Sequence, residues 1–169
     1  MEEVQYWFVH DKGLEITDRM LIPATLNTLS QSNVNNVFDN EADAIIRQTY
    51  LKNLYNSFKR TPYVASYIIE KNLKKFLEIE SEITKQLNDY PYFDGIDFCD
   101  VRAGGIQIRG FHKAITGYTY GSQITIKYDF SNWKECIEQF VGEWKRSDTK
   151  ENINSYQSFL DAGDRWGWD

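Results

Sequence analysis

Apolar residues recur every three or four positions along two neighbouring stretches, a spacing that predicts two consecutive helices. The first helix is expected to begin after Asn40, a good N-cap residue, and to end before Pro62. The residues expected on its buried face are Ala42, Ile45, Ile46, Tyr50, Leu54 and Phe58. The second helix is expected to run from Pro62, capped by Thr61, to about Asn88 with an unbroken apolar stripe. Its roughly 28 residues would span about 42 Å, which makes this helix the spine of the predicted fold.

Two other stretches have the composition or the spacing of strands, the first through its residue types and the second through a period of two. Residues 4–10 are β-branched and aromatic, and the turn-forming Asp11-Lys12-Gly13 follows them, so a β-hairpin returning through residues 14–16 is expected. Residues 95–130 predict a three-stranded antiparallel meander with one apolar face, whose clearest strand is 124–130.

A third helix is expected after Ser131, a residue that suits an N-cap. Its apolar stripe comprises Trp133, Ile137, Phe140, Val141 and Trp144. Such a stripe should lie on the sheet. Together these elements predict an α+β fold: a helical hairpin with one long helix, a three- to four-stranded antiparallel sheet, and a C-terminal amphipathic helix packed on it. No repeat or low-complexity tract interrupts the pattern, so residues 1–169 are expected to form a single domain.

Composition adds an acidic character to this picture, with a net charge of −6 and a pI near 5.0. Such a chain is not attracted to nucleic acid or anionic membranes by its overall field, but it can bind a basic partner. Its two cysteines, Cys99 and Cys136, lack metal or disulfide spacing and are expected to be reduced thiols. Without an expected signal peptide or membrane-spanning stretch, the protein is expected in the cytoplasm.

The charges are segregated along the chain, and this is the strongest functional signal in the sequence. Residues 46–76 carry a net charge of +6, and the following 24 residues carry −6. The basic residues nominated for nucleic-acid contact are Lys52, Lys59, Arg60, Lys71, Lys74 and Lys75. The residues nominated for binding a protein partner are Glu78, Glu80, Glu82, Asp94, Asp97, Asp100, Trp166 and Trp168.

No pattern of catalytic or metal-binding residues accompanies these charges. Two histidines, His10 and His112, stand at strand ends and outside any motif, so they are interpreted as unrelated and partly exposed. Asp97 and Asp100 should point to opposite faces of a strand, which favours a partner-facing acidic edge over a metal site. The glycine pair 104–105 precedes a strand, so it predicts a tight hairpin turn and not a phosphate-binding loop. No metal or cofactor is therefore expected.

These features favour a small non-enzymatic protein that binds another protein. In general character the chain resembles compact accessory proteins of phages and mobile elements, such as anti-CRISPR and antirestriction proteins, although no motif assigns it to a family. The resemblance implies an inhibitor in a bacterial host cell that covers the basic groove of a nucleic-acid enzyme, such as a CRISPR or restriction nuclease, with acidic and aromatic surface.

Three alternatives use other features of the sequence. An immunity protein or antitoxin would bind a basic nuclease through the same carboxylates. A nucleic-acid-binding accessory protein would use the basic helical segment 46–76. An enzyme acting on a small ligand would have His10, His112 and Asp100 as its candidate residues.

Overall fold

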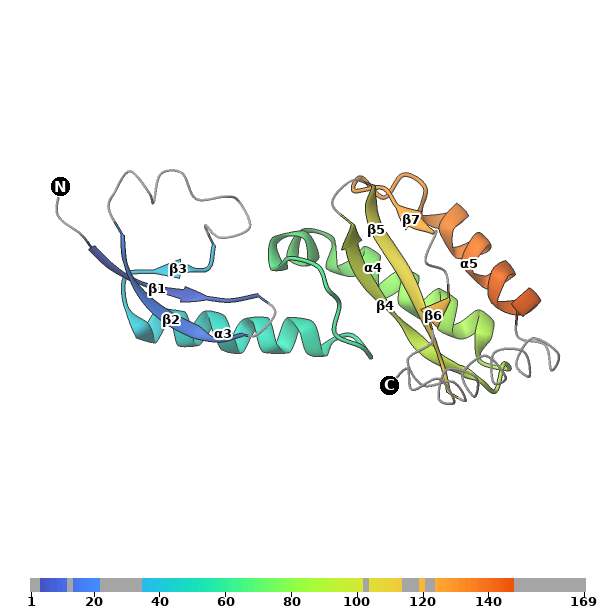
Figure 1. The fold of residues 1–169 in the computed structure, drawn as a ribbon, viewed down its shortest axis with the longest axis horizontal. Helices are drawn as coiled ribbons and strands as arrows, with labels where there is room; N and C mark the ends of the chain where they lie inside the picture. The colour runs from blue at the N-terminus through green and yellow to red at the C-terminus, as the bar shows by residue number, and fades with distance from the viewer. Residues whose placement is uncertain are drawn as a thin grey trace, which may run out of the picture. The chain divides into compact units, whose positions relative to one another are not determined.

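A computed structural model of the chain describes residues 4–11, 14–21, 35–101, 104–113, 119–120 and 124–147. These residues form three α-helices and two antiparallel sheets, which confirms the predicted α+β class (Figure 1). The chain divides into two compact units, Met1–Phe76 and Leu77–Asp169, and each is described by itself. That residues 1–169 form a single domain stays a prediction. None of the described helices is both long enough and apolar enough to span a bilayer.

The first unit contains a three-stranded sheet in the order β2-β1-β3. Strand β1 (Val4–Val9) pairs antiparallel with β2 (Ile16–Leu21) and with β3 (Val37–Phe38). The predicted N-terminal hairpin is therefore confirmed, but its second strand lies later than predicted, at Ile16–Leu21, and shares only Ile16 with the expected residues 14–16. Strand β3 was not predicted, because its two residues are too few to show any alternation.

Helix α3 (Glu41–Asn56) begins at the predicted N-cap, where the side chain of Asn40 accepts a hydrogen bond from the Asp43 amide at 2.9 Å. The face expected to be buried is wrong for most of its length. Ile45, Ile46 and Tyr50 are 46%, 67% and 45% exposed. The buried residues are Ala44, Leu51, Leu54 and Tyr55. The helix therefore carries two apolar stripes, and it packs on the sheet through only one of them.

Helix α4 (Ser66–Leu87) starts four residues later than predicted. Pro62 is therefore not its first residue, and Thr61 is not its cap. The expected unbroken helix is also wrong, because Asn72 departs from helical geometry at φ −127° and ψ 19°. The apolar stripe itself is confirmed, since five of its side chains are fully buried: Ile69, Phe76, Ile79, Ile83 and Leu87.

The second unit contains a four-stranded antiparallel sheet whose central strand is β5 (Gly105–His112). Strand β4 (Phe93–Val101) pairs with β5 in a register that shifts between Phe93 and Ile96, where Gly95 has a φ of +88°. On its other edge β5 pairs with two short strands, β6 (Thr119–Tyr120) and β7 (Thr125–Ile126). The strand expected at 124–130 is thus only two residues long, because the chain turns after it and the Phe130 amide bonds back to the Lys127 carbonyl at 2.8 Å.

Helix α5 (Trp133–Ser147) contacts this sheet through its aromatic residues. Gly110 of β5 leaves room for them, since a Cβ there would lie 2.5 Å from the Phe140 ring. Trp144 is almost fully buried and meets Phe93 edge to face at 5.2 Å between ring centroids. The stripe predicted for this helix therefore supplies much of the core of the second unit, although its first member, Trp133, is only half-buried.

Candidate functional site

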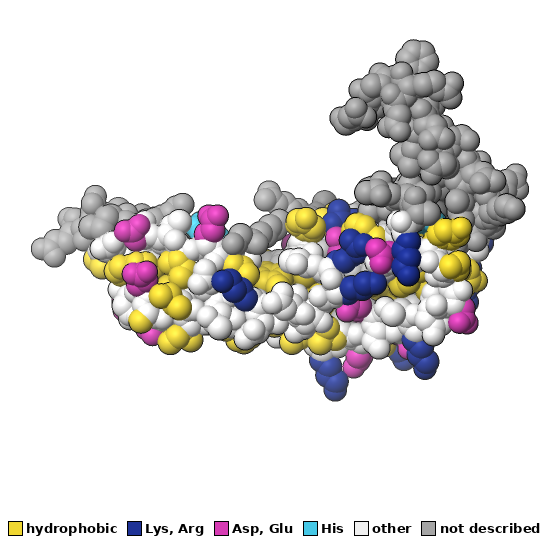
Figure 2. Space-filling view, turned by 90° about the horizontal axis from the view of Figure 1, so that it is seen from below, with side chains coloured by type: hydrophobic (Ala, Val, Ile, Leu, Met, Phe, Trp, Pro, Cys, Tyr) yellow, Lys and Arg dark blue, Asp and Glu magenta, His cyan; other side chains and the backbone are white. Residues whose placement is uncertain are grey.

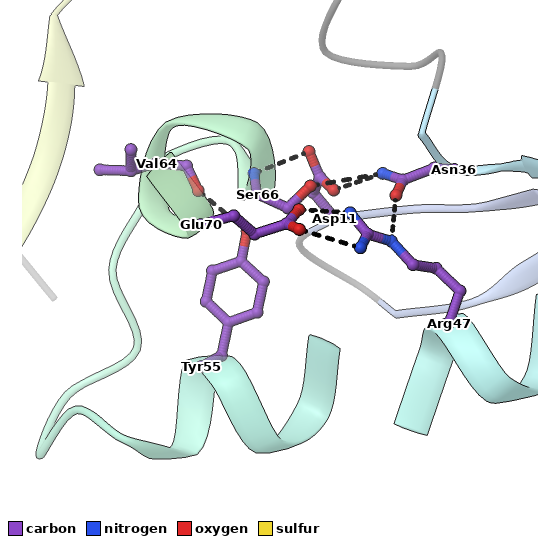
Figure 3. A network of polar contacts seen from close by, with 7 residues as sticks. All are labelled: Asp11, Asn36, Arg47, Tyr55, Val64, Ser66 and Glu70. Atoms are coloured by element: carbon purple, nitrogen blue, oxygen red, sulfur yellow. Dashed lines mark hydrogen bonds and ion pairs between the residues drawn. The ribbon is translucent and has the colours of Figure 1, made fainter. Parts of the chain in front are cut away.

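A chain of polar contacts in the first unit joins four segments around the guanidinium of Arg47 on α3 (Figure 3). Arg47 donates to Asn36 at 2.8 Å and forms a two-bonded ion pair with Glu70 on α4. Asn36 in turn donates to Asp11 at 2.6 Å, and the other oxygen of Asp11 accepts the Ser66 amide at 3.2 Å. We call these residues the Arg47 network.

The Arg47 network fixes the start of α4. Ser66 is the first residue of that helix, and its amide has no intrahelical partner, so the Asp11 carboxylate acts as a distant cap. This explains why the helix begins at Ser66 and not at Pro62. Asn36 and Ser66 are buried and the Arg47–Glu70 pair is partly buried, so the bonds of this network are partly shielded from water and favour one arrangement of the four segments.

Two tyrosines on α3 flank the network. Tyr55 is buried and donates its hydroxyl proton to the Val64 carbonyl at 2.9 Å. Burial, followed by the charges of Asp11 and Glu70, raises the pKa of Tyr55. Partial burial and the Glu70 carboxylate also raise the pKa of Tyr50, whose ring lies 5.2 Å from the Arg47 guanidinium carbon. Both hydroxyls therefore remain protonated at neutral pH and offer no base or nucleophile.

The nominated basic residues all lie in the first unit. Four of them are exposed, namely Lys52, Lys59, Lys71 and Lys74, and two are half-buried, namely Arg60 and Lys75. Across its full length this unit carries nine acidic and nine basic residues, so it has no net charge. The +6 stretch seen in the sequence is therefore balanced by acidic residues earlier in the same unit.

The nominated acidic residues all lie in the second unit, which carries sixteen acidic and ten basic residues and hence the whole net charge of −6. The boundary between Phe76 and Leu77 falls at the point where the charge of the sequence reverses. The half-buried members of the acidic set are Glu78, Glu80, Glu82, Asp94 and Asp100. These residues are partly accessible, although the Oε2 atom of Glu80 is buried. They belong to the unit that carries the whole net charge of the chain, while the other unit is neutral.

Asp97 differs from the rest of the acidic set. It is 3% exposed, and its two oxygens accept hydrogen bonds from Arg109 of β5 at 2.8 and 2.7 Å. Asp100 accepts a hydrogen bond from the Tyr128 hydroxyl at 2.5 Å. The charge of Asp97 is thus balanced inside the sheet. In the parts of the chain that the structure describes, no three acidic, histidine or cysteine side chains gather as metal ligands.

The two histidines lie in different units, each at the end of a strand of a different sheet. His10 follows β1, and its Nε2 lies 3.0 Å from the Thr17 hydroxyl. His112 ends β5 and is buried, with its ring stacked on Tyr92 at 4.9 Å between centroids. The expectation that both histidines are partly exposed is therefore wrong for His112, because it continues the buried face of β5.

The remaining nominated positions give no assembled chemistry within the described residues. Cys136 is buried, and burial raises the pKa of its thiol, which disfavours the nucleophilic thiolate. Trp166 and Trp168 lie outside the residues that the structure describes.

Sequence reasoning missed two features, the Arg47 network and the exposed apolar face of α3. Glu70, the lone acidic residue among seven basic ones in residues 46–76, was a usable signal for an ion pair. Hydrophobic side chains of the first unit reach the surface on the side where α3 lies (Figure 2).

Comparisons with protein-family models, with curated proteins and with solved structures gave no match.

Proposed function

We propose that the protein acts by binding another protein through the acidic surface of its second unit, and not by catalysing a reaction. The observation that carries this proposal is the division of charge: the second unit holds the whole excess of carboxylates, while the first is neutral. The complementary partner is a basic groove of the kind that nucleic-acid enzymes present to phosphate backbones. The protein would then be an inhibitor of the anti-CRISPR or antirestriction type, acting in the cytoplasm of a bacterial host.

The acidic side chains differ in what they can contribute to such an interface. Glu78, Glu82 and Asp94 are partly accessible. We propose these three as the main contacts of the surface. Asp97 contributes less, because Arg109 already binds both of its oxygens. An excess of like charge on one unit speeds encounter with a basic partner and makes binding fall with added salt.

The proposal is tested by mixing the full chain with a purified CRISPR nuclease–guide complex and, separately, with a restriction nuclease. Co-elution at low salt that is lost at high salt is the expected result with the cognate enzyme. The triple variant Glu78→Gln, Glu82→Gln, Asp94→Asn should weaken binding at least tenfold. Its matched control makes the same change in charge on exposed residues of the first unit: Glu15→Gln, Asp18→Asn, Asp39→Asn. Equal loss in both variants would contradict a surface confined to the second unit.

An immunity protein or antitoxin would use the same surface against a different nuclease. A toxin gene beside the gene for this chain, and co-elution with that toxin in place of the two enzymes above, would favour this alternative.

A second candidate function is nucleic-acid binding, which the exposed lysines of the first unit favour. Lys71 and Lys74 stand near the irregular residue Asn72, and Lys52 is exposed on α3. Gel shift with short DNA and RNA at low salt tests this function, and the variant Lys71→Glu, Lys74→Glu should remove any shift. No shift with the unaltered protein would dispose of the candidate.

A further inference from the structure

The side of α3 that faces away from the sheet carries an exposed, uncharged surface. Ile46 is the most exposed large apolar residue among those described, at 67%. Ile45 precedes it in the same turn, and Tyr50 lies one turn further on, at position i+4. The exposed residues on this side are Ala42, Ile45, Ile46, Thr49, Tyr50 and Asn53. This side therefore has no exposed charged residue in the middle of the helix, which is unusual for a helix surface that faces solvent.

Charges are found only toward the two ends of this surface, and they have opposite signs. Glu41 and Asp43 are exposed in the first turn, and Lys52 is exposed in the last turn but one. Ile46 lies beside the midpoint between positions 41 and 52. The surface is therefore complementary to itself when it is turned end for end.

The geometry points to a second copy of the chain as the occupant of this surface. Two α3 helices related by a twofold axis would run antiparallel, with Ile46 of each near the axis. Glu41 of each copy would then lie opposite Lys52 of the other, and the two helix dipoles would oppose each other favourably. A parallel arrangement would instead set like charges together.

The position of α3 is already fixed within the monomer. Arg47 and Gln48 hold the helix from its inner side, through Asn36 and Glu70 and through the Leu14 carbonyl, which accepts from Gln48 at 2.6 Å. The exposed side chains are thus presented from a rigid helix, and dimerisation need not first order it. A basic nuclease groove fits this surface poorly, because its centre carries no carboxylate.

The test is the oligomeric state of the full-length protein, measured by sedimentation equilibrium from about 5 μM to about 1 mM, a range that covers weak helix-pair interfaces. A reversible monomer–dimer equilibrium is expected. Ile46→Asn should raise the dissociation constant of the dimer at least tenfold. The control Tyr63→Ser, at another exposed apolar residue of the same unit, should leave it unchanged. A protein that is monomeric throughout, or a dimer indifferent to Ile46→Asn, would overturn the inference.

Charge reversal tests the antiparallel arrangement itself. Glu41→Lys and Lys52→Glu should each weaken self-association at least tenfold, because each places like charges opposite one another twice. The double variant should restore the dimer, and a mixture of the two single variants should form a heterodimer. Failure of both rescues would overturn the proposed pairing. Since these measurements use the protein alone, their outcome is independent of whether the acidic surface binds a nuclease.

Discussion

Asp97 differs in its surroundings from the other nominated acidic residues. Its carboxylate is buried in the sheet and shares both oxygens with one guanidinium, while Asp94 and Asp100 remain partly accessible. Breaking such a pair leaves the remaining charge without its counter-charge, and this costs more than the pair itself contributes.

We therefore expect Asp97→Asn to lower the free energy of unfolding by about 2 kcal/mol, less than for a wholly buried pair because Arg109 is 28% exposed. Urea denaturation measures this change. Asp100→Asn is the matched control, and we expect it to cost about 0.5 kcal/mol, because its partner Tyr128 is exposed. Equal effects of the two substitutions would contradict the distinction drawn between these carboxylates.

Tyr55 gives a pH dependence whose sign follows from its burial. The pKa of Tyr55 is raised in the folded protein, so the unfolded chain releases its proton first, near pH 10. The stability that the neutral hydroxyl contributes is complete below pH 10 and falls as the pH rises above it. The advantage of the unaltered protein over Tyr55→Phe should shrink by about 1 kcal/mol between pH 10 and pH 11.

Comparing the two proteins at each pH removes the effect of lysine deprotonation, which they share. A difference between the unaltered protein and Tyr55→Phe that stays constant as the pH rises would contradict a raised pKa of the Tyr55 hydroxyl in the folded protein.

At the scale of elements, the turn between β4 and β5 depends on one of two adjacent glycines. Gly105 has a φ of +121°, and a Cβ on it would lie 2.2 Å from the Ile126 carbonyl oxygen of β7. We expect Gly105→Ala to destabilise the protein by at least about 2 kcal/mol, through backbone strain and displacement of β7. Gly104→Ala should change stability by no more than about 0.5 kcal/mol, since among the described residues its Cβ would meet only the Thr125 methyl, at 3.6 Å. Thermal unfolding of the two variants side by side measures the difference.

An element was predicted correctly where its local sequence pattern was compatible with only one structure. The cap at Asn40 and the hairpin turn at Gly104-Gly105 follow from local chemistry, and both predictions were confirmed. The prediction of the buried face of α3 was wrong because the helix has two apolar faces with similar spacing. One carries Ile45, Ile46 and Tyr50, and the other carries Ala44, Leu51 and Tyr55. Only packing on the sheet determines which of the two is buried. The start of α4 depends on Asp11, which lies 55 positions away and is invisible to any local pattern.

At the scale of the whole molecule, the chain has two units with different electrostatic character. The charge reversal was evident from the sequence, but the boundary was not, because the apolar stripe of α4 passes through it. The acidic and basic candidate surfaces were predicted from the distribution of charged residues along the sequence. The exceptions, Arg47 with Glu70 and Asp97 with Arg109, required knowing which segments meet in space.

The Arg47 network lies wholly in the first unit, so its loss should lower the local stability of that unit. Arg47→Ala should reduce the protection of backbone amides against hydrogen exchange in β1, α3 and the first turns of α4. Protection of the β4–β5 amides in the second unit should change little, and Asp97→Asn should show the opposite distribution. Uniform loss of protection in both variants would mean that the two units unfold as one.

The irregular register of β4 bears on how the protein behaves at high concentration. Among the described strands, β4 is the last in the order of its sheet, and an open strand edge is a template for pairing with other molecules. The shift between Phe93 and Ile96, with Gly95 in a left-handed conformation, breaks the even row of amides and carbonyls that such pairing needs. We therefore expect this edge to resist aggregation into fibrils. Any self-association at high protein concentration should then occur through α3 and not through pairing of β4 edges.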